Sequence, residues 1–218
     1  MTERKGTGAI LLAGGRATRL GGIDKPLLEI DGRSLLQRAL DAVAGCDPVV
    51  VAGPARSDVA GAVTWVREDP PFTGPAAAIV AALAALPEQP ARPDAPGPAW
   101  TLVLACDLAD PAAAVAALTG ARAAASADLD GWCLGDRDGR AQWLTALYRT
   151  AALRRAAAAL PDAGTHASVR TLVGPLRLEL IAAGPATDDI DTWDDAERAG
   201  ARPRPVPTAL LTPTKETP

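Results

Sequence analysis

Short apolar runs alternate along this chain with alanine-rich segments of helical length. The runs hold few polar residues, as is typical of strands covered on both faces. Seven runs are predicted strands: 9–13, 48–52, 63–66, 101–105, 131–135, 143–148 and 177–182. Five segments are predicted helices: 34–44, 75–86, 111–121, 150–160 and 192–200. This alternation predicts an α/β fold with a mostly parallel sheet.

One connection departs from the alternation. The link between 131–135 and 143–148 is too short for a crossover helix, so these two strands are predicted to be antiparallel. Two helices begin with a proline, Pro75 and Pro111, at the helical position that tolerates it. Asp110, directly before Pro111, is the predicted N-cap of its helix.

Proline-rich stretches mark the expected boundaries. Residues 8–201 are expected to form one domain, with a flexible N-terminus at 1–7. Residues 87–98 carry five of the 20 prolines and are expected to be a surface loop. Residues 202–218 carry five more and are expected to be a flexible tail.

Composition narrows the kinds of partner. A net charge of -4 gives no general reason to bind nucleic acid or an anionic membrane, so a small molecule is expected. No run is long enough for a membrane span and no signal peptide is recognisable, which favours a cytoplasmic protein. Cys46, Cys106 and Cys133 fit reduced core positions. The lone histidine, His166, is expected in a surface loop, which disfavours a catalytic triad.

A glycine-rich loop follows the first predicted strand. The stretch LLAGGRATRLGGIDKPLL holds four glycines, whose backbone can approach an anion closely. Arg19 and Lys25 would supply countercharge. The stretch matches neither GxGxxG nor GxxxxGK[ST], the two common phosphate-binding fingerprints. Its place after a strand nevertheless predicts an anion site, with an ordinary solvated connection as the alternative.

The extended stretch LLAGGRATRLGGIDKPLLEIDGRSLLQRAL resembles the signature of nucleotidylyltransferases, and particularly of molybdenum cofactor guanylyltransferases. The resemblance implies a Rossmann-like, three-layer nucleotidyltransferase fold for the domain at 8–201. It also implies catalytic roles for Lys25 and Arg19. The nucleotide contacts that it implies in this stretch are Leu12, Ala13, Gly14, Gly15 and Lys25.

Two later motifs extend the resemblance. EDPPFTGPAAAIVAAL resembles a family segment in which an aspartate precedes a GP-led helix, which implies nucleotide contacts at Asp69 and Gly74. An ordinary turn residue is the alternative for Asp69. TLVLACDLADP resembles the metal-binding strand end of the family, which implies that Asp107 is catalytic and binds both Mg²⁺ and nucleotide. Helix capping is the alternative for Asp107.

Two further segments leave alternatives open. GRAQWLTALYR resembles a strand near the acceptor, where Gln142 and Arg149 could contact the substrate, or the segment could simply pack. DDIDTWDDAERA resembles the closing motif of the family, but Asp189 and Asp191 replace its usual asparagines. Asp191 is a candidate for a second Mg²⁺ ligand. The alternative is that this segment only forms a capping box at the start of the next helix.

The implied reaction is transfer of GMP from Mg²⁺-bound GTP, or another NTP, to a molybdopterin-type phosphate acceptor. An attacking phosphate oxygen is already anionic and needs no general base, so positioning and charge neutralisation suffice. A cytidylyltransferase or a sugar-1-phosphate nucleotidylyltransferase of the same fold is an alternative, and a non-catalytic nucleotide-binding protein is another. The sequence leaves open the base, the acceptor and the oligomeric state.

Overall fold

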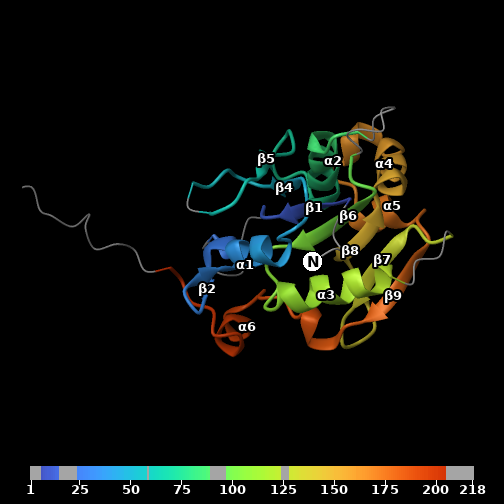
Figure 1. Ribbon diagram of the computed structural model, residues 1–218. Helices are drawn as coiled ribbons and strands as arrows, with labels where there is room; N and C mark the ends of the chain where they lie inside the picture. The colour runs from blue at the N-terminus through green and yellow to red at the C-terminus, as the bar shows by residue number, and fades with distance from the viewer. Residues whose placement is uncertain (1–5, 15–23, 58, 89–96, 124–127, 205–218) are drawn as a thin grey trace, which may run out of the picture.

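The computed structural model describes residues 6–14, 24–57, 59–88, 97–123 and 128–204. A seven-stranded sheet forms its centre (Figure 1). Each pair of neighbouring strands is parallel except the two pairs that include β8, which is antiparallel to both β6 and β7. The strands in spatial order are β5 (Thr64–Val66), β4 (Val49–Ala52), β1 (Thr7–Leu12), β6 (Trp100–Ala105), β8 (Ala141–Arg149), β7 (Gly131–Gly135) and β9 (Leu178–Ala182).

Helices cover both faces of the sheet and make three layers (Figure 1). Successive residues of a strand point to opposite faces, so Leu11 packs with α1 (Leu35–Ala42) and α3 (Pro111–Arg122). Ile10 packs on the other face with α2 (Pro75–Ala85), α4 (Thr150–Ala158) and α5 (Val169–Val173). Burial on both faces explains why these strands read as continuous apolar runs rather than alternating ones.

A third, smaller apolar cluster joins distant parts of the chain. It includes Leu28 and Ile30, which lie before and within a short hairpin of β2 (Glu29–Ile30) and β3 (Arg33–Ser34). Ile190 and Ala196 complete it from the C-terminal segment, where α6 (Trp193–Arg198) lies. Backbone hydrogen bonds between Glu29 and Arg202, 2.8 Å in each direction, hold the two parts together.

All the predicted strands and helices are confirmed, with ends within two residues of those expected. The antiparallel pairing of β7 with β8 is also confirmed. The β2–β3 hairpin and α5, whose elements span two to five residues, were not predicted from the sequence. Cys46, Cys106 and Cys133 are buried free thiols, as expected.

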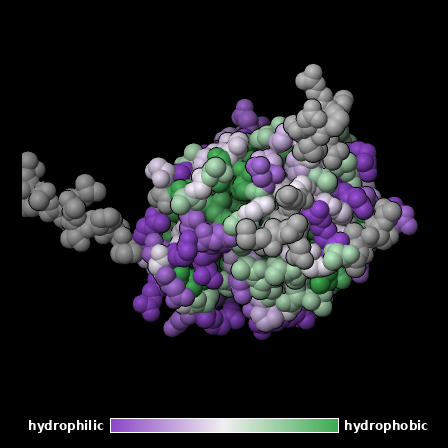
Figure 2. Space-filling model, viewed as in Figure 1, coloured by the Kyte–Doolittle hydropathy of each residue, from purple (hydrophilic) through white to green (hydrophobic). Residues whose placement is uncertain are grey.

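Hydrophilic and apolar residues are interspersed on the face of the molecule seen in Figure 2, with an area of apolar residues over α3. Within the described ranges, no helix combines the length and the apolar character that crossing a membrane requires. His166 is exposed in the connection before α5, as predicted.

Candidate functional site

The candidate site lies where β1 and β6 end. These strands pair in parallel, with Leu12 opposite Ala105, so the residues that follow them emerge at one edge of the sheet. Gly14 follows β1, and Asp107 follows β6. Ligands of open α/β sheets bind beyond the carboxyl ends of the strands, so this edge is the expected location of a site.

Lys25 connects two carboxylates at this edge. Its Nζ donates to Asp107 Oδ2 at 2.8 Å and to Asp191 Oδ1 at 2.6 Å. Burial alone would lower the pKa of the Lys25 ammonium, but the charge of Asp107 and hydrogen bonds to both carboxylates raise it above its usual value. Lys25 therefore stays protonated and carries a fixed positive charge.

Backbone pairing brings Asp191 to this position. The segment 188–190 runs antiparallel to 107–109, with Ile190 N donating to Asp107 O at 2.9 Å and Ala109 N donating to Asp188 O at 2.9 Å. Residues 82 and 166 positions from Lys25 in the sequence thus converge on one ammonium group.

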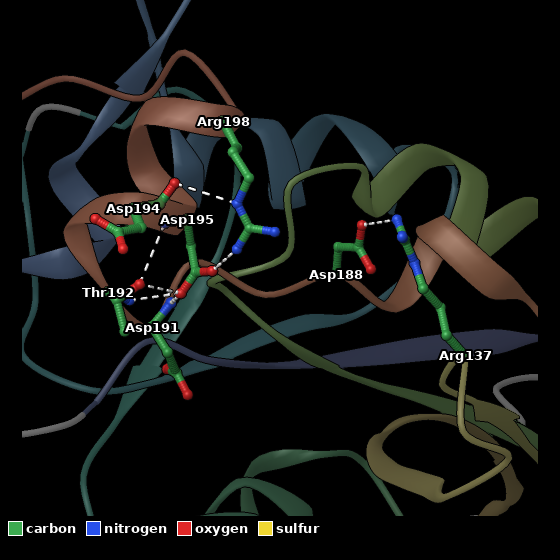
Figure 3. A network of polar contacts seen from close by, with 7 residues as sticks. All are labelled: Arg137, Asp188, Asp191, Thr192, Asp194, Asp195 and Arg198. Carbon is green, nitrogen blue, oxygen red and sulfur yellow. Dashed lines mark hydrogen bonds and ion pairs between the residues drawn. The ribbon is translucent and has the colours of Figure 1, made fainter.

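A capping box stabilises α6 directly after Asp191. Thr192 Oγ1 accepts from Asp195 N at 3.2 Å, and Asp195 Oδ2 accepts from Thr192 N at 2.7 Å (Figure 3). Hydrogen bonding from Thr192 is the first cause of the lowered pKa of Asp195. The capping box is confirmed, and it uses Thr192 and Asp195, while Asp191 faces Lys25.

Among the described residues around Lys25, negative charge exceeds positive charge. The pKa of Asp189 is raised, first because burial desolvates its carboxyl group. Repulsion from the carboxylates of Asp191 and Asp107 raises it further. Three carboxylates therefore share the neighbourhood of one ammonium group. Among the described residues, no group of three or more His, Cys, Asp or Glu side chains is arranged to hold a metal ion.

An apolar cavity of about 380 Å³ opens beside this cluster. Leu12, Ala52, Ala78 and Leu144 contribute apolar walls, and Gly14 and Gly74 contribute backbone. Asp107 lines both this cavity and a smaller one of about 60 Å³ that contains Lys25. A flat apolar group could therefore lie in the larger cavity with an anionic group next to Lys25.

The backbone of the glycine-rich loop packs closely against the end of β4. A Cβ atom on Gly53 would lie 2.9 Å from the carbonyl carbon of Ala13 and 3.2 Å from Gly14 N. Because glycine has no Cβ, the backbone of residues 13 and 14 can pack directly against residue 53.

The structure brings together most of the residues that the sequence suggested. Leu12, Gly14, Gly74 and Asp107 line the cavity, and Lys25 and Asp191 lie at its polar end. Ala13 lies against Gly53. Arg19 and Gly15 lie outside the described residues. The roles of all these residues stay predictions.

Asp69 is exposed and is not among the described lining residues; its neighbour Glu68 lines the cavity instead. Glu68 was not predicted from the sequence, although its place beside Asp69 was a usable signal. Glu68 comes directly before the bend at 69–70, whereas Asp69 lies within it.

Arg149 lies at the edge of the sheet opposite to Asp107, and its suggested contact with an acceptor stays a prediction. Arg149 pairs with Trp100, at the start of β6, whereas Asp107 follows its end. Its Nε donates to Leu129 O at 2.7 Å, and its guanidinium lies 4.5 Å from the centre of the Trp100 ring. Gln142 donates to Asp136 Oδ2 at 3.0 Å. Tyr148 is buried and donates to Trp143 O at 2.7 Å, so it packs in the core.

A groove of about 620 Å³ is lined by the 188–190 segment together with Ala109, Arg137 and residues of α6. Arg137, from the turn between β7 and β8, pairs with Asp188 at 2.6 Å. Arg198, from α6, pairs with Asp195. Figure 3 shows Arg137 directed toward Asp188 and Arg198 directed toward Asp195. Neither arginine was singled out from the sequence, because each lies in an ordinary polar stretch.

The family comparison covers most of the chain. Residues 9–177 match the MobA-like NTP transferase domain. A molybdenum cofactor guanylyltransferase of Rhodopseudomonas palustris is 46% identical over 89 residues. That match covers 38% of this chain and 41% of the relative, so the chain spans about two fifths of the length of this curated protein.

Solved structures share the fold. The molybdopterin-guanine dinucleotide biosynthesis protein A of Archaeoglobus fulgidus aligns with a TM-score of 0.61 and 17% identity, covering 88% of this chain and 96% of that one. The 2-C-methyl-D-erythritol 4-phosphate cytidylyltransferase of Thermus thermophilus aligns with a TM-score of 0.59 and 18% identity, covering 88% and 96%. At these identities the likeness concerns the fold alone.

Proposed function

The chain belongs to the MobA-like NTP transferase family, and from this premise we propose that it transfers GMP from Mg²⁺-bound GTP to the phosphate of a molybdopterin-type acceptor, releasing pyrophosphate. The partial match to a molybdenum cofactor guanylyltransferase supports the choice of GTP and acceptor. The observation that carries the proposal is the position of Lys25, between Asp107 and Asp191 at the mouth of the cavity.

The donor set fits a magnesium ion. Asp107 and Asp191 offer carboxylate oxygens at the polar end of the cavity, and the surplus of negative charge among the described residues there favours a divalent cation. Mg²⁺ on a triphosphate needs only one or two carboxylates, because phosphate oxygens and water complete its octahedron. When bound, Mg²⁺ would neutralise charge on the triphosphate.

The side chains of this protein would act mainly by position and charge. Lys25, kept protonated by its carboxylate partners, would bind phosphate oxygens and stabilise the charge that develops on the departing pyrophosphate. Gly14 leaves space for the triphosphate to approach the backbone beside it. A phosphate nucleophile is already ionised, so the proposed reaction requires no base among the described residues.

The groove lined by the 188–190 segment is the candidate surface for the acceptor. Arg137 and Arg198 offer cationic groups that suit a phosphate, and the carboxylates beside them suit the N–H groups of a pterin ring. The 188–190 segment that lines the groove leads directly to Asp191, so an acceptor held there would lie near the proposed reacting phosphate.

An assay of pyrophosphate release tests the proposal. With Mg²⁺, GTP and molybdopterin, we expect pyrophosphate and a guanylylated pterin product, and no product when either GTP or the acceptor is omitted. CTP with the same acceptor, and GTP or CTP with methylerythritol phosphate or a sugar 1-phosphate, serve as comparisons. Faster turnover with CTP or with another acceptor would contradict the proposal. Nucleotide binding without any pyrophosphate would instead identify a non-catalytic protein.

The close packing at Gly53 yields a further prediction. Gly53→Ala would place a methyl group against Ala13 and Gly14 and push the loop toward the cavity. We expect the Kd for Mg-GTP to rise by between about tenfold and a hundredfold, because small displacements of a binding loop are costly. Calorimetric titration would measure this effect.

Gly120→Ala is the matched control for Gly53→Ala. Gly120 lies in α3, where an added Cβ meets no described atom within 4 Å, so nucleotide affinity should not change. An unchanged Kd in correctly folded Gly53→Ala would show that the loop does not depend on this close approach.

A further inference from the structure

The charged side chains of the larger cavity are all of one sign. Among the described residues that line it, Glu68 and Asp107 carry the charged groups. Asp107 already accepts from Lys25 at the phosphate end. Glu68 is therefore the carboxylate left to meet a group that enters the apolar part of the cavity.

The local structure holds the Glu68 carboxylate in place before any ligand arrives. Its Oε1 accepts from Phe72 N at 2.9 Å, four residues further along. The same turn is fixed by Thr73, whose Oγ1 donates to Pro70 O at 3.1 Å and whose carbonyl oxygen accepts from His166 N at 2.8 Å.

The carboxylate retains acceptor capacity. Within the described ranges, no hydrogen bond reaches Oε2 of Glu68, while Oε1 has one partner and a second lone pair. A carboxylate accepts from two parallel N–H groups in a bidentate arrangement. The site thus presents two neighbouring acceptors at the edge of an apolar slot.

This pair of acceptors distinguishes the nucleobases. Guanine presents two adjacent donors, N1–H and the 2-amino group, along one edge. Adenine and cytosine present a donor beside an acceptor, and uracil has one N–H between two carbonyl oxygens. A carboxylate can therefore pair fully with guanine, whereas with each other base it faces at least one lone pair.

We propose that Glu68 selects guanine by accepting hydrogen bonds from N1–H and the 2-amino group of the base. The inference rests on the proposed function, since it takes the cavity to be the base site of a nucleotidyltransferase. It assigns base choice to a side chain of the loop before α2, and it makes Glu68 a specificity-determining residue.

Glu68→Gln tests this assignment through a gain as well as a loss. The amide oxygen can still accept from Phe72 N or from N1–H, so the loop is retained. The amide NH₂ opposes the 2-amino group of guanine but can donate to the carbonyl oxygen that xanthine has at that position. We expect GTP affinity to fall by about tenfold to a hundredfold and XTP to become the better ligand.

The measurement is calorimetric binding of Mg-GTP, Mg-CTP and Mg-XTP to the wild type and the variants. Glu179→Gln is the matched control: Glu179 is exposed on β9 and accepts from Trp132 Nε1, a hydrogen bond that the amide oxygen can keep. This control should prefer GTP over XTP, as the wild type should. An inversion confined to Glu68→Gln would support the proposal.

Other outcomes would overturn it. If Glu68→Gln still prefers GTP, or loses GTP and XTP to the same extent, Glu68 does not read the base, while a wild-type preference for GTP leaves the proposed function standing. A wild type that prefers CTP, or binds no NTP, would contradict the guanylyltransferase proposal and this inference together.

Discussion

Asp107→Asn is expected to lower the rate of pyrophosphate release at least about a thousandfold while the fold survives. The amide keeps the shape of the side chain, and its oxygen can still accept the hydrogen bond that Lys25 donates to Asp107 at 2.8 Å. The substitution removes the negative charge after β6. Mg²⁺ prefers hard, negatively charged oxygen ligands, so it should bind the amide more weakly than the carboxylate. Steady-state pyrophosphate release over a range of Mg²⁺ concentrations would measure the effect.

Asp41→Asn is the control for this charge change. Asp41 lies on α1 and pairs with Arg33 at 2.7 Å, with both side chains exposed, so neutralising it should leave turnover and Mg²⁺ dependence unchanged. Circular dichroism would confirm that both variants fold. A folded Asp107→Asn protein that turns over at the wild-type rate would refute the role assigned to Asp107.

Lys25→Met should lower the same rate by about a hundredfold or more, in the range seen when one preorganised charge or donor is removed from a site. Methionine has a similar length and is apolar, so the variant removes the ammonium with little change in volume. It also leaves Asp107 and Asp191 without the group that bridges them. Single-turnover measurements at saturating Mg-GTP would separate this loss from weaker binding.

Lys25→Arg separates charge from shape. Arginine keeps a positive charge but replaces a compact ammonium with a planar fork, so we expect a rate between those of the wild type and Lys25→Met. An equal loss in both variants would contradict a mainly electrostatic role, because only one of them removes the charge.

The sheet and its covering helices could be predicted because burial on both faces leaves a strong apolar signal. Ile10 and Leu11 pack against opposite helix layers, so β1 has no polar side and stands out in the sequence. The strands of the β2–β3 hairpin are two residues long, too short to show an alternation of apolar and polar residues. Its turn did carry a signal, since Asp31 and Gly32, with φ of 51° and 74°, form the Asp-Gly pair that hairpins favour.

Several residues of the candidate site could be suggested from the sequence, but the geometry of the site could not. Asp107 could be suggested from its place after a strand, and Lys25 from its glycine-rich loop. The role of Asp191 stayed open, because its approach to Lys25 depends on the register of 188–190 against 107–109, a tertiary contact that no local pattern encodes. The exposure of Asp69 and the inward position of Glu68 likewise depend on how one turn is oriented.

The pairing of 107–109 with 188–190 also orders events during synthesis on the ribosome. The strands β5, β4, β1 and β6 all lie before residue 106, so the parallel half of the sheet can assemble early. Asp191 emerges only after the last strand, β9, has been made. A nascent chain interrupted at residue 187 would contain every strand of the sheet yet lack Asp191, so translation must pass this point before the two carboxylates can meet at Lys25.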